Sequence, residues 1–296
     1  MDYRTDLAME RTVYPGGTGE GVSVQTQMEG DAVITWVRIY TAAAAKRLGK
    51  AEGTYWTMMH PDLPNLTPED RIQIARQVAQ TLRIMLPPHG DVLVLGLGNR
   101  RMTADALGDR VVSGILVTRH MAENTPSLRG VCAMSPGVLG VTGVETAELA
   151  LGLVERLKPS AVLVVDALAA METDHIGTTI QLTDTGIHPG SGVDNHRLGI
   201  TQETLHVPVV AMGIPMVVYA STIVRDALKS ILSAEKDESD AYEMATHLVS
   251  RTQTDLIVTP RNIDELVAGL ADMLALAINS ALQPSCSIDE LTHLLH

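Results

Sequence analysis

Residues 91–108 read DVLVLGLGNRRMTADALG, and this stretch decides the fold class. The apolar run 92–95, bounded by an aspartate and a glycine, predicts a buried parallel strand. Glycines directly after the run let the backbone turn sharply and leave room for another group to approach. Thr103 is expected to cap a helix that carries Asp105 in its first turn. The helix dipole favours a charged carboxylate at that position. The stretch therefore predicts a carboxylate directed into a site at a strand end.

A second stretch repeats this arrangement. Residues 161–170 read AVLVVDALAA, in which an apolar run ends at Asp166. In open α/β sheets the working crevice lies beyond the carboxyl ends of the strands, so both aspartates are expected to face one crevice. Two carboxylates in one site can share a proton and act as acid and base on a water molecule. Gly98, Asn99 and glycine-rich loops are expected to shape this cleft through backbone contacts.

Composition narrows the class of protein. The chain has 296 residues, of which 45% are hydrophobic and 19% charged, as in globular proteins. Its net charge of −13 argues against nucleic-acid binding through a basic surface. Cys132 and Cys286 form no CxxC pair, and the N-terminus lacks a signal-peptide run, which together favour a reduced, cytoplasmic chain. The uncharged stretch 204–224 is interrupted by prolines and a glycine, so a buried strand and a helix are expected there rather than a membrane span.

Strands and helices alternate along most of the chain, which predicts an α/β fold with a mainly parallel or mixed sheet flanked by helices. Residues 1–20 predict a flexible arm. The expected strands are a hairpin over 22–27 and 32–40, then 92–95, 131–134, 161–166, 178–184 and 207–212. The expected helices are one that starts at Pro68 with Thr67 as its cap, then 147–157, 221–232 and 262–282.

Several catalytic motifs are absent or incomplete. The sequence contains no GxxxxGK[ST], HExxH or GxSxG, which disfavours kinases, zincins and α/β-hydrolases. The segment GLGNRR has Arg101 in place of the third glycine of the dinucleotide fingerprint, and no cofactor is predicted. Ser191 lacks a strand–turn–helix setting and is interpreted as a loop serine. One alternative remains open: Asp105, Asp166 and His188 together could hold a catalytic metal, although a surface histidine is the simpler interpretation of His188.

Taken together, the motifs resemble one family, the germination proteases of endospore-forming bacteria, which are similar in fold to hydrogenase maturation proteases. The matching segments occur in family order and cover well over a third of the chain. They read RTDLAMER, VLGLGN, TADALG, VTRH, PGVLGVTGVET, VVDALAA, TIQLTDTGIHPGSGVDNHR and VPVVAMGIP.

The resemblance implies an endopeptidase of the forespore or spore core that degrades small acid-soluble spore proteins during germination. It also implies a zymogen, a homotetramer, and no direct partner among nucleic acids or membranes. The two catalytic aspartates of the family fall on Asp105 and Asp166. Further residues expected to shape the cleft lie in the glycine-rich loops: Gly143, Glu145, Gly190 and Gly192.

The N-terminal segment YRTDLAME, residues 3–10, matches the propeptide junction of the family: an acid, then an aliphatic residue, then alanine. This match predicts self-cleavage between Asp6 and Leu7, with residues 1–6 as the propeptide and 7–296 as a single α/β peptidase domain. The alternative from another class is an inactive binding protein with the same fold. Its support is a set of departures from the family pattern at Ala104, Asp194, Met216 and Tyr219.

Overall fold

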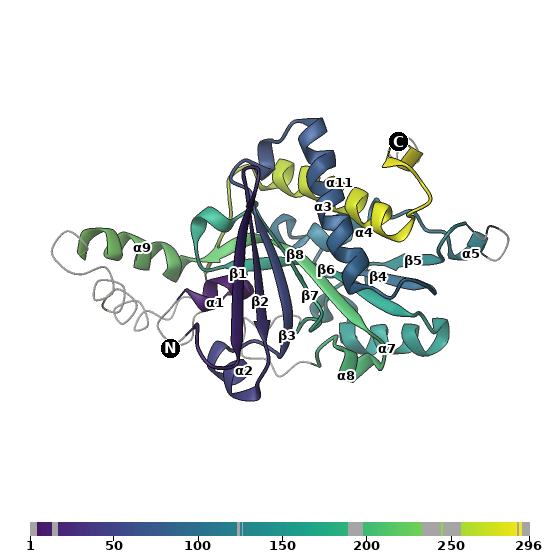
Figure 1. The fold of residues 1–296 in the computed structure, drawn as a ribbon, viewed down its shortest axis with the longest axis horizontal. Helices are drawn as coiled ribbons and strands as arrows, with labels where there is room; N and C mark the ends of the chain where they lie inside the picture. Colours follow the sequence, from purple (N-terminus) through teal and green to yellow (C-terminus); the bar gives the residue numbers. More distant parts are fainter. Residues whose placement is uncertain are drawn as a thin grey trace.

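A computed structural model describes residues 5–13, 17–122, 125, 127–188, 198–232, 244, 256–288 and 290–291. Within these residues the strands form a single sheet, in the order β1-β2-β3-β7-β8-β6-β4-β5, with β9 paired to β8 (Figure 1). The strands are β1 (Val22–Glu29), β2 (Ala32–Ile39), β3 (Gly53–Met59), β4 (Val92–Gly96), β5 (Val131–Met134), β6 (Ala161–Ala170), β7 (Thr179–Thr183), β8 (Val209–Tyr219) and β9 (Ile257–Val258).

The sheet has two halves that meet at β8. Strands β1, β2, β3 and β7 pair antiparallel, and β7 pairs antiparallel with β8. On its other side, β8 pairs parallel with β6, which continues the parallel half through β4 to β5. The predicted α/β fold with a mixed sheet is confirmed, and so is the predicted hairpin, which forms β1 and β2.

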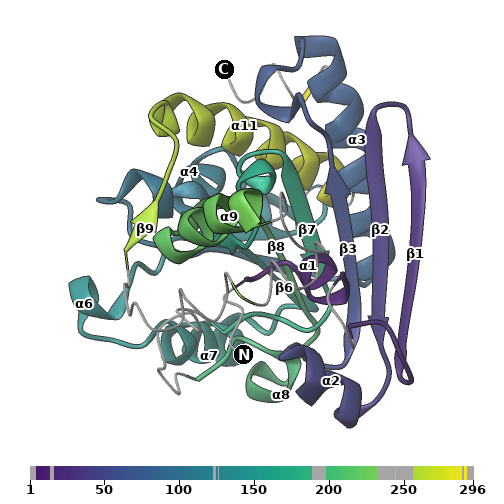
Figure 2. The same ribbon diagram turned by 90° about the vertical axis from the view of Figure 1, so that its left-hand side faces the viewer.

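Helices cover both faces of the sheet (Figure 2). On one face, α3, α4 and α11 contribute to a large apolar core with alternate strand residues such as Val94, Leu163 and Val210. On the other face, α7 and α8 pack on Leu95 and Val164, and α1 and α2 pack on β2 and β3. The helices are α1 (Ala8–Thr12), α2 (Ala42–Leu48), α3 (Pro68–Met85), α4 (Leu107–Ser113), α5 (Arg119–Ala122), α6 (Leu139–Thr142), α7 (Thr146–Leu157), α8 (Gln202–Leu205), α9 (Ala220–Leu232) and α11 (Ile263–Leu282), with 3-10 turns η1 (Leu63–Asn65), η2 (Thr103–Asp105) and η3 (Thr173–His175).

Two local predictions about the aspartates were wrong. Asp105 does not lie in the first turn of an α-helix capped by Thr103: it ends the 3-10 turn η2, and α4 starts at Leu107. Gly108 lets α4 lie close to the strands, because a Cβ there would lie 2.5 Å from backbone atoms of Leu97 and Val165. Asp166 does not end its strand either. Strand β6 continues to Ala170 because β8 pairs with it as far as Val218.

The expectation of a flexible arm over residues 1–20 was wrong for the residues around α1. Leu7 and Ala8 are 0% and 1% exposed: Leu7 packs against β6 and β8, and Ala8 packs against β2 and β3. Apolar burial of this kind stabilises an ordered segment, by roughly 1.5–3 kcal/mol for a fully buried leucine. The N-terminal segment is therefore part of the folded structure from Thr5 to Val13.

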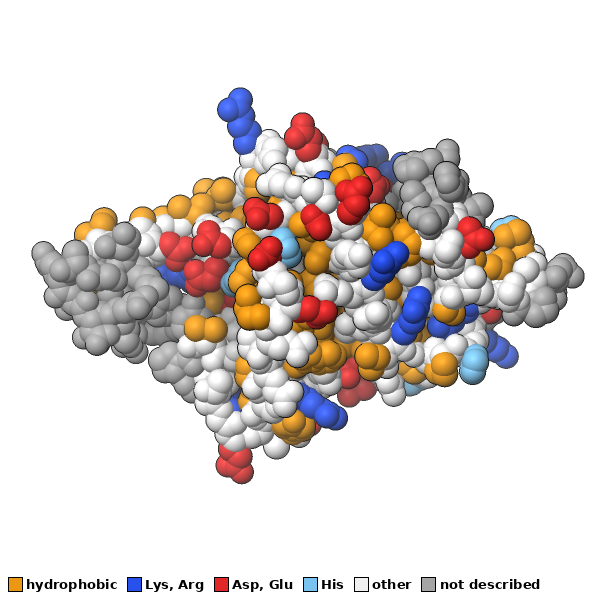
Figure 3. Space-filling view, turned by 45° about the horizontal axis from the view of Figure 1, so that its top comes forward, with side chains coloured by type: hydrophobic (Ala, Val, Ile, Leu, Met, Phe, Trp, Pro, Cys, Tyr) orange, Lys and Arg blue, Asp and Glu red, His pale blue; other side chains and the backbone are white. Residues whose placement is uncertain are grey.

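One helix among the described residues, α11, is long and apolar enough to cross a membrane by length and composition, but 72% of its apolar window is buried. It packs against α3 and α4 and is a core helix of this fold. On the face drawn in Figure 3, acidic and basic side chains are interspersed, and the basic ones are scattered rather than gathered into a stripe.

Candidate active site

Asp166 lies in a row of residues that crosses β8, the strand at which the two halves of the sheet meet (the seam of the sheet). In the strand register, Asp166 on β6 pairs with Gly213 on β8, and Gly213 pairs with Gln181 on β7. Side chains paired in register point to the same face of a sheet. Here that is the face opposite α3 and α11, because the neighbours of Gln181, Ile180 and Leu182, belong to the α3–α11 core. Gly213 has no side chain, and the side chain of Leu168 lies over it: a Cβ at Gly213 would lie 2.8 Å from Cγ of Leu168.

Asp105 reaches the same place from the loop after β4. Gly98 adopts a left-handed φ of +100°, and a Cβ there would lie 1.9 Å from the carbonyl oxygen of Asp105. Only glycine therefore allows the loop to close over η2. The backbone N–H of Asn99 then donates a hydrogen bond of 2.8 Å to Oδ2 of Asp105. Gly98 and Asn99 thus both contact Asp105, and their role in shaping the cleft stays a prediction.

The charge of Asp105 acts on Asp166. Burial, then the negative charges of Asp105 and Asp6, raise the pKa of Asp166 well above its usual range. Burial also raises the pKa of Asp105, while the Asn99 N–H acts in the opposite direction by stabilising the charged form. A carboxylate raises the pKa of another in this way when the two lie near each other. Asp105, Asp166 and Asp6 are thus gathered at one place on the sheet.

Asn at position 166 is expected to change how stability depends on pH. The folded pKa of Asp166 lies above its unfolded value near 3.8, so its contribution to stability is complete below that value and is lost as pH rises through the folded pKa. Asp166→Asn cannot ionise. The difference between its melting temperature and that of the wild type should therefore shift in favour of the variant as pH rises above about 4. Thermal melts from pH 3 to 8 would measure this, with the exposed Asp31→Asn as control. Parallel curves for Asp166→Asn and wild type would contradict the raised pKa.

The N-terminal segment crosses this face next to the aspartates. The backbone N–H of Asp6 donates to the carbonyl of Ala169 at 2.9 Å, and the N–H of Ala169 donates to the carboxylate of Asp6 at 2.8 Å. Leu7 is buried against Leu168, Ala170 and Val218. Asp6 and Leu7, on either side of the bond between them, thus contact β6 in different ways. Asp6 hydrogen-bonds to its backbone, and Leu7 packs against its side chains.

Two side chains converge on the carbonyl oxygen of Asp6. Nζ of Lys50 donates to it at 2.9 Å, and Nε2 of Gln181 donates to it at the same distance. Lys50 also donates to the Thr5 carbonyl at 3.0 Å, and Oε1 of Gln181 accepts the backbone N–H of Ala8 at 2.7 Å. Burial lowers the pKa of Lys50, although the nearby Asp6 charge opposes this shift.

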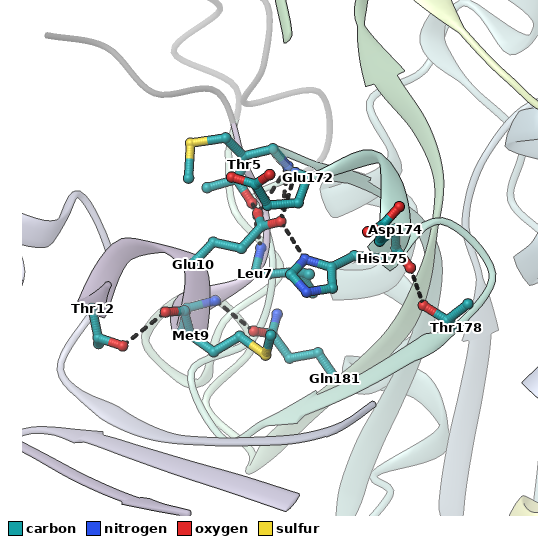
Figure 4. A network of polar contacts seen from close by, with 12 residues as sticks. Thr5, Leu7, Met9, Glu10, Thr12, Glu172, Asp174, His175, Thr178 and Gln181 are labelled. Carbon is teal, nitrogen blue, oxygen red and sulfur yellow. Dashed lines mark hydrogen bonds and ion pairs between the residues drawn. The ribbon is translucent and has the colours of Figure 1, made fainter. Parts of the chain in front are cut away.

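Glu10 anchors the segment on the far side of Leu7 (Figure 4). Its carboxylate is 2% exposed and accepts the backbone N–H groups of Met171 and Glu172, each at 2.9 Å. Nδ1 of His175 lies 2.6 Å from the same carboxylate, and the hydroxyl of Thr5 also hydrogen-bonds to it. A buried charge of this kind requires several partners, and the turn after β6 supplies them.

The remaining predicted site residues are placed differently. His188 is exposed and lines a cavity of about 180 Å³, together with Asp6, Lys50, Gln181 and Gly213. Gly143 ends α6 with a left-handed φ of +74°, and Glu145 precedes α7, so the contribution of these two to the cleft stays a prediction. Gly190, Gly192, Ser191 and Asp194 lie outside the described residues.

Lys50, Gln181 and Glu10 were not identified as site residues from the sequence. Lys50 follows a short helix and looks like an ordinary surface lysine. Gln181 occupies the polar position of an alternating strand, where a solvent-facing side chain is the normal interpretation. For Glu10 a signal was present, because it is a charged residue in the fourth position after the proposed cleavage junction.

Comparison with known proteins agrees with these features. The sequence profile of the germination proteases matches residues 8–242. The germination protease of Caldanaerobacter subterraneus subsp. tengcongensis is 40% identical and aligns over 100% of this chain and 99% of its own. That of Clostridium perfringens is 37% identical over 99% of both chains, and that of Bacillus cytotoxicus is 32% identical over 94% and 93%.

Among solved structures, the NiFe hydrogenase maturation protease HycI from Thermococcus kodakarensis covers 67% of this chain and 98% of its own. The TM-score is 0.34 at 18% identity. The sequence matches, by contrast, extend over nearly the whole chain at 32–40% identity. This chain therefore belongs to the germination protease family, a family of endopeptidases.

Proposed function

We propose that this chain is a self-processing endopeptidase of spore germination that cleaves small acid-soluble spore proteins after an acidic residue. The observation that carries the proposal is the docked N-terminal segment. Its Asp6–Leu7 bond lies across the sheet face that presents Asp166, and the charge of Asp6 acts on that aspartate. The segment thus occupies the cleft as a substrate would, and its acid–aliphatic–alanine order is the pattern expected of a substrate.

The environments of the two aspartates favour different roles. The strongly raised pKa of Asp166 favours its neutral form, which can donate a proton to the leaving nitrogen of Leu7. Asp105 accepts the Asn99 N–H, which stabilises its ionised form, so Asp105 is the base that takes a proton from the attacking water. A pair of carboxylates with separated proton affinities can in this way perform both proton transfers of peptide hydrolysis.

The proposal includes the processing of the chain. Residues 1–6 form a propeptide, and residues 7–296 form a single peptidase domain that acts in the forespore or spore core, as a homotetramer. The contacts of Glu10 and Leu7 support this division, because both residues lie after the cleaved bond and would keep the new N-terminus attached.

Metal-assisted hydrolysis by Asp105, Asp166 and His188 is the alternative mechanism. Among the residues that the structure describes, no three or more His, Cys, Asp or Glu side chains are arranged to hold a metal. His188 contributes to the cavity beside Asp6, but it is not grouped there with both aspartates.

Self-cleavage is expected between Asp6 and Leu7, and it tests the proposed function directly. The purified full-length chain would be incubated at mildly acidic pH and followed by intact mass and N-terminal sequencing. The product should begin Leu-Ala-Met-Glu, and Asp105→Asn should stay intact. A wild-type chain that stays intact, or equal cleavage in the variant, would contradict the proposal. Exhaustive chelation should leave the rate unchanged; loss of activity that a single divalent metal restores would favour the metal mechanism.

A further inference from the structure

We propose that Lys50 and Gln181 form the oxyanion-binding site of this protease, and this inference rests on the proposed cleavage between Asp6 and Leu7. The carbonyl group of the bond to be cleaved is that of Asp6. Its oxygen accepts a hydrogen bond of 2.9 Å from Nζ of Lys50 and another of 2.9 Å from Nε2 of Gln181. Donors placed on a carbonyl oxygen before reaction stabilise the negative charge that develops there, because they need no reorganisation.

The orientation of Gln181 is determined by its own contacts. Its Oε1 accepts the backbone N–H of Ala8 at 2.7 Å, so its NH₂ group must be the end that faces the Asp6 oxygen. Gln181 also spans the bond to be cleaved, since it contacts the carbonyl before that bond and the second N–H after it. A substrate bound in the same way would be held in register on both sides of the reacting carbon.

Among the residues that the structure describes, the side chain of Lys50 donates its hydrogen bonds to the N-terminal segment. The two hydrogen bonds that the structure gives its Nζ both go to carbonyl oxygens of the N-terminal segment, those of Thr5 and Asp6. A buried ammonium is costly unless it is paired or hydrogen-bonded. When residues 1–6 leave, the ammonium loses both acceptors and becomes available to the corresponding carbonyls of a substrate. An anchor used only by the propeptide would not need a charged donor on the reacting carbonyl.

The chemistry balances with the groups already assigned. The oxygen of a water molecule bonds to the carbonyl carbon of Asp6 as Asp105 takes one of its protons. The π electron pair of the carbonyl moves onto its oxygen, where Lys50 and Gln181 hold the charge. As the pair returns, the carbon–nitrogen bond to Leu7 breaks and Asp166 supplies a proton to the nitrogen. The products are an α-carboxyl group on Asp6 and a free amine on Leu7.

A purely structural anchor and an oxyanion site predict different results. The segment is held independently by the paired contacts of Asp6 with Ala169 and by the burial of Leu7. Removal of one donor should therefore leave the segment seated and slow only the chemical step. A structural anchor would instead release the segment when it is removed.

The test compares Lys50→Met, Gln181→Met and the exposed-surface control Lys46→Met in the full-length chain. Removing one oxyanion donor is expected to slow first-order conversion at Asp6–Leu7 by about 10²- to 10³-fold. Lys50→Arg should recover part of the lost rate because it keeps the charge, and Lys46→Met should convert at the wild-type rate. Hydrogen exchange at the Asp6 and Ala169 amides should stay as slow as in wild type in both donor variants. Thermal melts would verify that each variant is folded.

Conversion within about threefold of wild type in both folded donor variants would overturn the assignment, since an oxyanion donor contributes far more than that. Slow conversion with fast exchange at the Asp6 and Ala169 amides would also overturn it, because it would identify the two side chains as anchors. A wild-type chain that never converts would instead contradict the proposed function. If Lys50→Met fails to fold, Lys50→Arg and Gln181→Met still decide the question.

Discussion

Asp105→Asn and Asp166→Asn are each expected to slow cleavage at Asp6–Leu7 by about 10²- to 10⁴-fold, the range in which a positioned acid or base contributes to catalysis. Asn keeps the shape of Asp but cannot accept a proton from water or supply one to the leaving nitrogen. The Asn99 N–H can still donate to the side-chain oxygen of Asn at position 105, so the loop over η2 should remain closed.

The measurement is the first-order conversion rate of the full-length chain, with cleavage of a peptide that carries an acid–Leu–Ala junction as a second substrate. Asp31→Asn, on the exposed turn between β1 and β2, is the matched control and should convert normally. Unfolded variants are recognised by their thermal melts. Near-normal conversion by a folded Asp105→Asn or Asp166→Asn would remove that residue from the mechanism.

Glu10→Ala is expected to have the largest effect on stability. The substitution removes the carboxylate that accepts the N–H groups of Met171 and Glu172, and it removes the hydrogen bond to His175. Removing one partner of a buried hydrogen bond costs about 1–3 kcal/mol, and Glu10 takes part in several. Glu10→Gln keeps the size of the side chain and one acceptor oxygen, so its cost should be smaller.

Thermal melts would measure this effect, at about 2–4 °C per kcal/mol for a domain of this size. Glu29→Ala, at the exposed end of β1, is the control and should melt as the wild type does. Amide exchange at Met171 and Glu172 should accelerate in Glu10→Ala. If Glu10→Ala and Glu29→Ala melt together, the network in Figure 4 does not hold the segment.

Much of the fold could be predicted because local patterns agree with the final structure. Thr67 caps α3 by accepting the Asp70 N–H, and Pro68 opens the helix, as the sequence indicates. The apolar run after Asp91 becomes β4, and the alternation around Glu29 becomes a hairpin. The antiparallel half of the sheet was harder to foresee, because the pairing of β7 with both β3 and β8 depends on residues far apart in the chain.

The site was predictable only where a residue type carries its own chemical signal. Two aspartates after apolar runs attract notice by themselves, and the resemblance then singled them out. Gln181 carries no such signal, because its role depends on the register that places it one strand away from Gly213. The strand end expected at Asp166 failed for the same reason: pairing with β8 extends β6 beyond the residue at which its apolar run stops.

The seam at β8 has a consequence for biosynthesis. The groups proposed for catalysis come from both halves of the sheet, and β8 is the strand that joins them, although it is the last of the long strands to be made. Pairings between distant segments form late in folding, because the intervening loops must close first. A nascent chain on the ribosome therefore carries Lys50, Asp105 and Asp166 long before it carries an assembled cleft. The order of synthesis delays proteolytic competence until translation has passed residue Tyr219.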